Sequence, residues 1–135
     1  MKKDVHYEFV DMMEYVSKSN LKGYYYAGGQ IELLQDAFDV EWILLEMDNY
    51  YEGEWYAIFK MNEKWHLLNG YFGSCSGCDD LEDEDPLTWL ENHVKNVRAF
   101  GSVIQAMCWL ETTDEFSYTP SVKSCMLREL ERVHR

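Results

Sequence analysis

Two neighbouring segments in the middle of the chain, residues 54–61 and 64–72, show the period-two alternation of side chains that is typical of β-strands. In the first segment the positions that share one face are Trp55, Ala57, Phe59 and Met61. An apolar run in residues 41–50 precedes them and predicts a third strand. The connections at Glu52-Gly53 and Asn62-Glu63 are short, so the pattern predicts a three-stranded antiparallel sheet in meander order.

Spacings of three and four between apolar residues predict helices before and after this sheet. The segments with this spacing are residues 4–17, 30–38, 86–97, 103–110 and 119–133. Pro86 suits the first position of a helix, and Ser102 suits an N-cap. Residues 97–100 also fit a short strand or an irregular turn. We therefore expect an α+β fold with helices on one face of the sheet and a Cys-x-x-Cys turn after its third strand.

The length of 135 residues and the 47% hydrophobic content predict one domain, residues 1–135, with a sizeable core. No apolar stretch approaches the 18 residues that a membrane span requires. The first residues, Met1 to His6, lack the apolar centre of a signal peptide. We therefore expect a cytoplasmic protein that does not bind membranes.

The net charge of -13 is concentrated in residues 23–91, which hold 16 acids and 2 bases. Such a surface repels nucleic acids and anionic lipids, whereas it attracts basic proteins and speeds their association. General solubility is the alternative explanation for the acidic composition. The concentration in one segment favours a basic protein partner and no direct contact with nucleic acid.

Cys75 and Cys78 form a Cys-x-x-Cys pair in the turn Gly73-Ser74-Cys75-Ser76-Gly77-Cys78. Two thiolates at this spacing supply half of a tetrahedral structural zinc site. We expect Zn²⁺ as the cofactor, with His93 and Cys108 as the remaining ligands, and these two can share a metal only if the chain turns near Gly101. Further ligand candidates are Cys125, His66 and Asp79. Plain reduced thiols and a redox pair are the alternatives, and the acids that follow the turn disfavour the reactive thiolate of a redox pair.

The acidic run directly after the turn predicts a partner-binding surface. Its members are Asp79, Asp80, Glu82, Asp83, Glu84 and Asp85. Tyr24 to Tyr26, Tyr50 and Tyr51 are candidate aromatic anchors for the same partner.

The heptapeptide Gly73-Ser74-Cys75-Ser76-Gly77-Cys78-Asp79, placed between an aromatic hairpin and a helix, resembles a segment of small uncharacterised proteins of bacteriophages and their hosts. The resemblance covers residues 54–110. In its small size, acidity and candidate zinc site the chain is also similar to anti-CRISPR proteins, including inhibitors of Cas9.

This resemblance implies an inhibitor that is not an enzyme. It would block DNA binding by occupying the basic surface of a CRISPR effector nuclease. The alternative is a metal-dependent enzyme with an open zinc position, in which Asp79 or Glu82 acts as the base. Four protein ligands on the metal would indicate a structural site, and three ligands plus water would permit catalysis.

Overall fold

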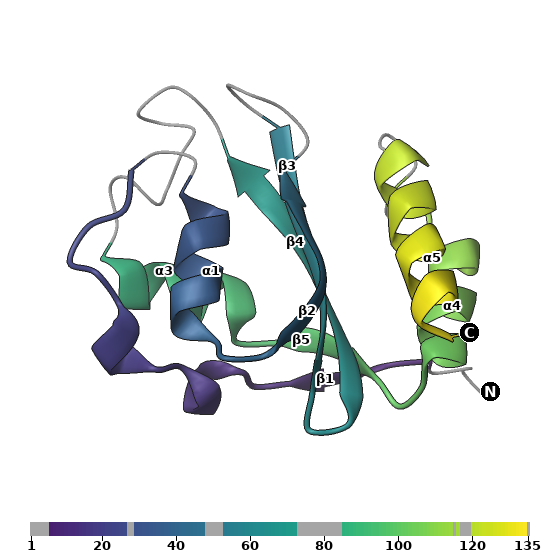
Figure 1. The fold of residues 1–135 in the computed structure, drawn as a ribbon, viewed down its shortest axis with the longest axis horizontal. Helices are drawn as coiled ribbons and strands as arrows, with labels where there is room; N and C mark the ends of the chain where they lie inside the picture. Colours follow the sequence, from purple (N-terminus) through teal and green to yellow (C-terminus); the bar gives the residue numbers. More distant parts are fainter. Residues whose placement is uncertain are drawn as a thin grey trace.

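The computed structural model describes residues 6–26, 29–47, 53–72, 85–114, 116 and 120–134. At its centre is a five-stranded antiparallel sheet in the order β1-β5-β4-β3-β2, with helices on both faces (Figure 1). The strands are β1 (Glu8–Val10), β2 (Glu41–Met47), β3 (Gly53–Met61), β4 (Lys64–Phe72) and β5 (Val97–Phe100). The helices are α1 (Gln30–Ala37), α3 (Pro86–Val94), α4 (Val103–Thr112) and α5 (Pro120–His134), with 3₁₀ turns η1 (Met13–Tyr15) and η2 (Lys18–Asn20).

The predicted meander forms the β2, β3 and β4 part of this sheet, but the prediction of three strands in all is wrong. The segment at residues 97–100 is a strand, and it extends the sheet because β5 pairs antiparallel with β4, with Phe100 opposite Trp65. β1 then pairs with β5, with Glu8 opposite Ala99. The α+β class itself is confirmed.

The helix predicted over residues 4–17 is also wrong. In the described part of this segment, β1 ends at Val10 and a 3₁₀ turn follows. The Asp11 carboxylate accepts a hydrogen bond from the Met13 amide at 2.9 Å, which favours a turn over a continuing strand. Met12 is fully buried while Phe9 is 61% exposed, so the helix-like spacing does not mark a single buried face.

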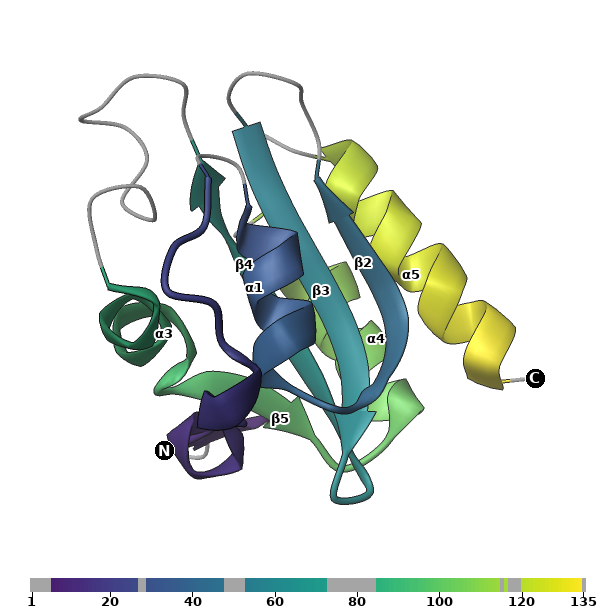
Figure 2. The ribbon, with the colours of Figure 1, turned by 60° about the vertical axis from the view of Figure 1, so that its left-hand side comes forward.

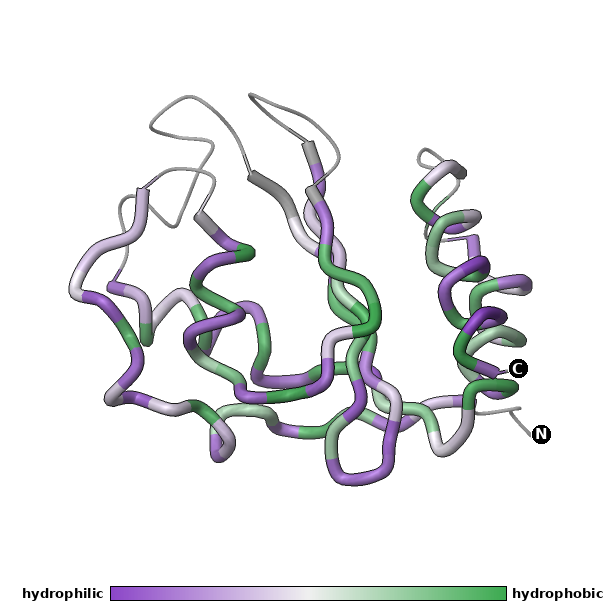
Figure 3. The backbone as a smooth tube through the Cα atoms, in the orientation of Figure 1, coloured by the Kyte–Doolittle hydropathy of each residue, from purple (hydrophilic) through white to green (hydrophobic). Residues whose placement is uncertain are grey.

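Two apolar clusters cover the two faces of the sheet, so the expectation that the helices pack on one face is wrong. The first cluster joins α1 and α3 to Trp55 and Phe59 of β3. The second cluster joins α4 and α5 to Tyr56 and Ile58 of the same strand. Figures 1 and 2 show the resulting three layers, and Figure 3 shows the apolar stretches along the central strands. Both faces of β3 carry large apolar side chains at the centre of the strand, which is why each face requires a helical layer.

Local signals in the sequence place several element ends correctly. Pro86 is the first residue of α3, and the Ser102 hydroxyl accepts a hydrogen bond from the Gln105 amide at 3.2 Å at the start of α4. Asn62 and Glu63 both have positive φ, 54° and 63°, as expected for the tight two-residue turn between β3 and β4. None of the helices in the described ranges has the length and apolar character needed to cross a bilayer.

Candidate functional site

The predicted zinc turn belongs to the connection between β4 and α3. Cys75 and Cys78 lie outside the described residues. So do five of the six predicted partner-binding acids, Asp79, Asp80, Glu82, Asp83 and Glu84. A zinc site at this turn and a binding role for these acids therefore stay predictions.

Asp85, the last acid of the run, is described and caps α3. Its carboxylate oxygen Oδ2 accepts hydrogen bonds from the amides of Leu87 at 3.1 Å and Thr88 at 3.3 Å. A carboxylate at this position also interacts favourably with the positive end of the helix dipole. The side chain is exposed, so the capping role is compatible with the predicted contact to a partner.

His93, a predicted zinc ligand, lies near the end of α3 with its ring stacked on Trp89. The two rings are 4.2 Å apart between centroids with an interplanar angle of 16°. The Nδ1 atom of His93 lies 2.8 Å from the carbonyl oxygen of Trp89. A carbonyl only accepts hydrogen bonds, so Nδ1 carries the proton when this bond forms, and Nε2 keeps a lone pair. Histidines that bind metals are commonly oriented in this way.

Cys108, the other predicted ligand, is exposed on α4. α4 belongs to the second cluster and α3 to the first, so the sheet separates Cys108 from His93 (Figure 1). The chain does turn near Gly101, as expected, but the turn carries it to the opposite face. The structure therefore does not bring these two side chains together. Within the described ranges, no three His, Cys, Asp or Glu side chains are grouped so that they could hold a metal.

The three consecutive tyrosines at residues 24–26 have different environments. Tyr25 is buried, its hydroxyl donates to Asp36 Oδ2 at 2.7 Å, and burial raises its pKa to about 12. Tyr24 and Tyr26 are 51% and 77% exposed, and their rings meet edge to face at 5.3 Å. Only these two of the three remain candidates for aromatic anchors. Tyr50 and Tyr51 lie outside the described residues.

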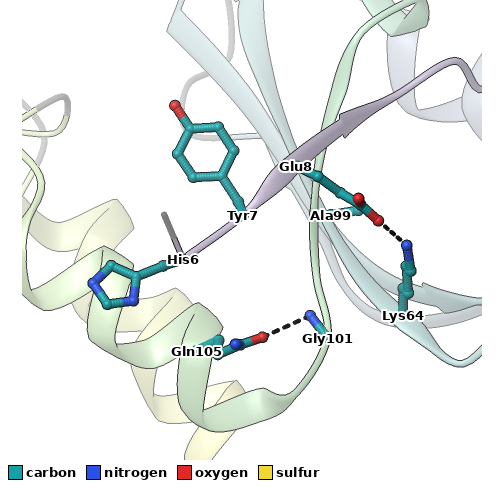
Figure 4. Close-up of a pocket in the computed structure, with 7 residues that line it drawn as sticks. All are labelled: His6, Tyr7, Glu8, Lys64, Ala99, Gly101 and Gln105. Carbon is teal, nitrogen blue, oxygen red and sulfur yellow. Dashed lines mark hydrogen bonds and ion pairs between the residues drawn. The ribbon is translucent and has the colours of Figure 1, made fainter. Parts of the chain in front are cut away.

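A pocket of about 360 Å³ lies where β1, β4 and β5 meet the start of α4 (Figure 4). The residues that line it are His6, Tyr7, Glu8, Lys64, Ala99, Gly101 and Gln105. Glu8 forms an ion pair with Lys64, and the Gln105 side-chain oxygen accepts from the Gly101 amide at 2.9 Å. Most of the polar lining is therefore satisfied by neighbouring protein groups, which leaves few donors or acceptors for a bound molecule.

A second pocket, of about 340 Å³, adjoins the first because Lys64 lines both. Its lining consists of Val10, Asp11, Glu14, Tyr15, Met61, Asn62, Lys64 and His66. His66 is only 2% exposed and stacks on Phe59 with ring centroids 5.0 Å apart. Burial lowers the pKa of His66 to about 4, so the ring is neutral at neutral pH. The alternating pattern of β4 assigned His66 to a face of the sheet, but it could not show that the ring borders a pocket built partly from residues 10–15.

The two helical layers differ in charge. α1 and α3 carry acids and no lysine or arginine: Glu32, Asp36 and Glu91. α4 and α5 together carry three acids and three bases: Glu111, Glu129, Glu131, Lys123, Arg128 and Arg132. The helices α1 and α3 are therefore net acidic, although Lys22 pairs with Glu32, whereas acids and bases balance on α4 and α5.

No family model matches the chain, and neither a curated protein nor a solved structure does.

Proposed function

We propose that this protein is a small acidic interaction protein that binds the basic surface of a nucleic-acid-handling protein and thereby blocks access of nucleic acid. The observation that carries the proposal is the uneven charge: 16 acids against 2 bases in residues 23–91, within a chain of net charge -13. A polyanionic surface competes with phosphates for the same lysines and arginines of a partner.

The fold supports this proposal because it sorts the charge by layer. The helices α1 and α3 carry acids and no lysine or arginine, whereas acids and bases balance on α4 and α5 on the other face. The exposed pair Tyr24 and Tyr26 directly precedes α1 and supplies aromatic surface on the acidic side. Aromatic anchors with surrounding charge are typical of protein interfaces.

The specific partner that we propose is a CRISPR effector nuclease such as Cas9, met in the cytoplasm. This choice rests on the phage-type resemblance of residues 73–79 and on the general anti-CRISPR-like character of the chain. It is narrower than the charge argument, which requires only a basic protein that handles nucleic acid.

We also propose that Zn²⁺ staples the connection before α3 through Cys75 and Cys78, with His93 as a third ligand. Support comes from the described geometry of His93, whose Nδ1 is held by the Trp89 carbonyl, so that Nε2 offers its lone pair. Elemental analysis of protein purified without chelator should find about one zinc per chain. A Cys78→Ser variant should lose the metal and become insensitive to chelator. If the wild-type protein contains no metal, the proposed zinc site is wrong, but the proposal based on charge is unaffected.

The acidic surface is tested with two variants, each of which has three charge-removing substitutions. Their binding to a basic protein is compared. The first set is Asp79→Asn, Asp80→Asn and Asp83→Asn, and it leaves the cap at Asp85 in place. The matched control set, outside residues 23–91, is Glu111→Gln, Asp114→Asn and Glu115→Gln.

Surface plasmon resonance at low salt should show that the first set lowers the association rate constant, by up to about tenfold, with a smaller change in dissociation. The control set should change the association rate little. Equal losses from the two sets would mean that the acidic run has no special role. Tight binding of the wild type to DNA or RNA alone would contradict the proposal.

A further inference from the structure

The pocket beside His66 has a local charge that its ion pair does not cancel. Three acids lie in or next to it, Glu8, Asp11 and Glu14, and Lys64 is the base among the lining residues. Lys64 on β4 is already paired with Glu8 on β1. The carboxylates of Asp11 and Glu14 therefore leave the pocket with a net negative charge.

A buried ring nitrogen in the same pocket has no partner. His66 lines the pocket, is 2% exposed, and its Nδ1 makes no hydrogen bond. In the neutral ring that carries its proton on Nε2, Nδ1 is an acceptor. A buried acceptor without a donor destabilises the folded protein. A ligand that donates an N–H to this acceptor therefore binds more tightly.

The remaining lining fits a long side chain that is apolar along its stem and donates at its tip. Val10 and Met61 supply apolar surface, and the Tyr15 hydroxyl is held by the Asn62 side chain at 2.6 Å. A volume of about 340 Å³ lies at the small end of the range for ligand pockets, about 300–1,000 Å³. This size suits a single side chain better than a whole cofactor.

We infer that this pocket receives an arginine side chain of the basic partner, with the carboxylates of Asp11 and Glu14 and the Nδ1 atom of His66 as acceptors. The inference rests on the proposed function and adds to it a defined contact point. Arginine suits the pocket better than lysine because its planar guanidinium directs five N–H donors outwards and can reach several acceptors at once. The methylene stem would lie along Val10 and Met61.

The test uses the full chain and a single-residue probe, acetyl-arginine amide, with acetyl-citrulline amide as the control. Citrulline has nearly the same shape but carries no charge. NMR titration should show saturable binding of the arginine probe in the millimolar range. It should also show a shift of the His66 Nδ1 resonance as a hydrogen bond forms. The citrulline probe should bind at least about tenfold more weakly, since charged hydrogen bonds are worth about 1.5–3 kcal/mol.

Matched variants locate the contact. Glu14 is exposed, so Glu14→Gln should fold normally, and it should weaken binding of the arginine probe about tenfold. Glu63→Gln removes the same charge from a nearby residue that does not line the pocket, and it should change binding less than about twofold.

Three results would overturn the inference: equal binding of the two probes, equal losses in the two variants, or a His66 resonance that does not move. These outcomes are separable from failure of the proposed function. If the acidic-run variants lose affinity for the basic protein while Glu14→Gln keeps it, the proposed function stands and the arginine pocket is rejected. If the arginine probe binds as expected but the chain binds no basic protein, the pocket stands and the proposed function is rejected.

Discussion

Gly70 gives the sharpest test of the packing between the sheet and α3. It lies opposite Trp55 on the neighbouring strand, and the indole ring occupies the space that a side chain at position 70 would need. A Cβ atom built at Gly70 would lie 2.6 Å from Cζ2 and 2.8 Å from Nε1 of Trp55. Trp55 is fully buried and packs on Trp89 with ring centroids 5.7 Å apart, so the ring cannot move aside easily.

We expect Gly70→Ala to lower the free energy of unfolding by about 1 kcal/mol. Overpacking in a core costs about 1–3 kcal/mol, which exceeds the roughly 0.5–1 kcal/mol that alanine normally gains over glycine in a strand. With a urea dependence of about 1–3 kcal/mol per molar, the midpoint should fall by about 0.5 M. Urea unfolding followed by tryptophan fluorescence measures this shift.

Two further variants check the reason for the loss. Gly23→Ala should be at least as stable as the wild type, because a Cβ at Gly23 meets no atom within 4 Å. A phenylalanine ring at position 55 is smaller than the indole, so Gly70→Ala combined with Trp55→Phe should lose less stability than the sum of the two single variants. A Gly70→Ala protein with wild-type stability would refute the described packing of Trp55 against β4.

Other predictions concern the hairpin, the cap of α3 and the buried histidine. Glu63 has a φ of 63°, so Glu63→Gly should relieve about 1 kcal/mol of strain and raise the melting temperature by about 4 °C; a lower melting temperature would contradict this. Asp85→Ala should cost about 1 kcal/mol in urea unfolding and Asp85→Asn much less, because asparagine also caps helices; equal losses would argue against the cap. The folded pKa of His66 is about 4 against an ordinary 6.5, so the unfolded chain takes up a proton first as the pH falls. The stability that His66 contributes is therefore complete above pH 6.5 and falls by about 3 kcal/mol towards pH 4. Ring ¹⁵N shifts should show a neutral His66 at pH 5, and a charged ring in the folded protein at that pH would contradict the prediction.

The central strands could be predicted from the sequence because their information is local. Residues 54–61 and 64–72 show a period-two pattern, and the Asn62-Glu63 turn fixes their register. β1 could not be found in this way because its partner β5 lies about 90 residues further along the chain. Its spacing imitates a helix, since Phe9 is exposed while Met12 is buried. The second helical layer was predictable in principle, because both faces of β3 carry large apolar side chains, such as Phe59 and Ile58, that must be covered.

The features of the candidate sites also divide into those that local sequence predicts and those that depend on the tertiary fold. Capping by Ser102 was predictable from residue type and position alone. The separation of His93 from Cys108 was not, because it depends on which face of the sheet each helix covers. The pocket at His66 joins β4 to residues 10–15, and no local pattern in either segment indicates that they meet.

The most direct test of the proposed function is competition between this protein and DNA for a basic nuclease. A Cas9–guide RNA complex on a biosensor is first saturated with the protein and then offered its target DNA, and the order is then reversed. We predict mutually exclusive binding, in which the protein prevents DNA from associating and binds poorly to the DNA-loaded nuclease. We also predict that the effect weakens with salt, as the Debye length falls from about 10 Å at 0.1 M to about 3 Å at 1 M. Simultaneous binding of the protein and DNA, or no binding of the protein to the nuclease at low salt, would contradict the proposal.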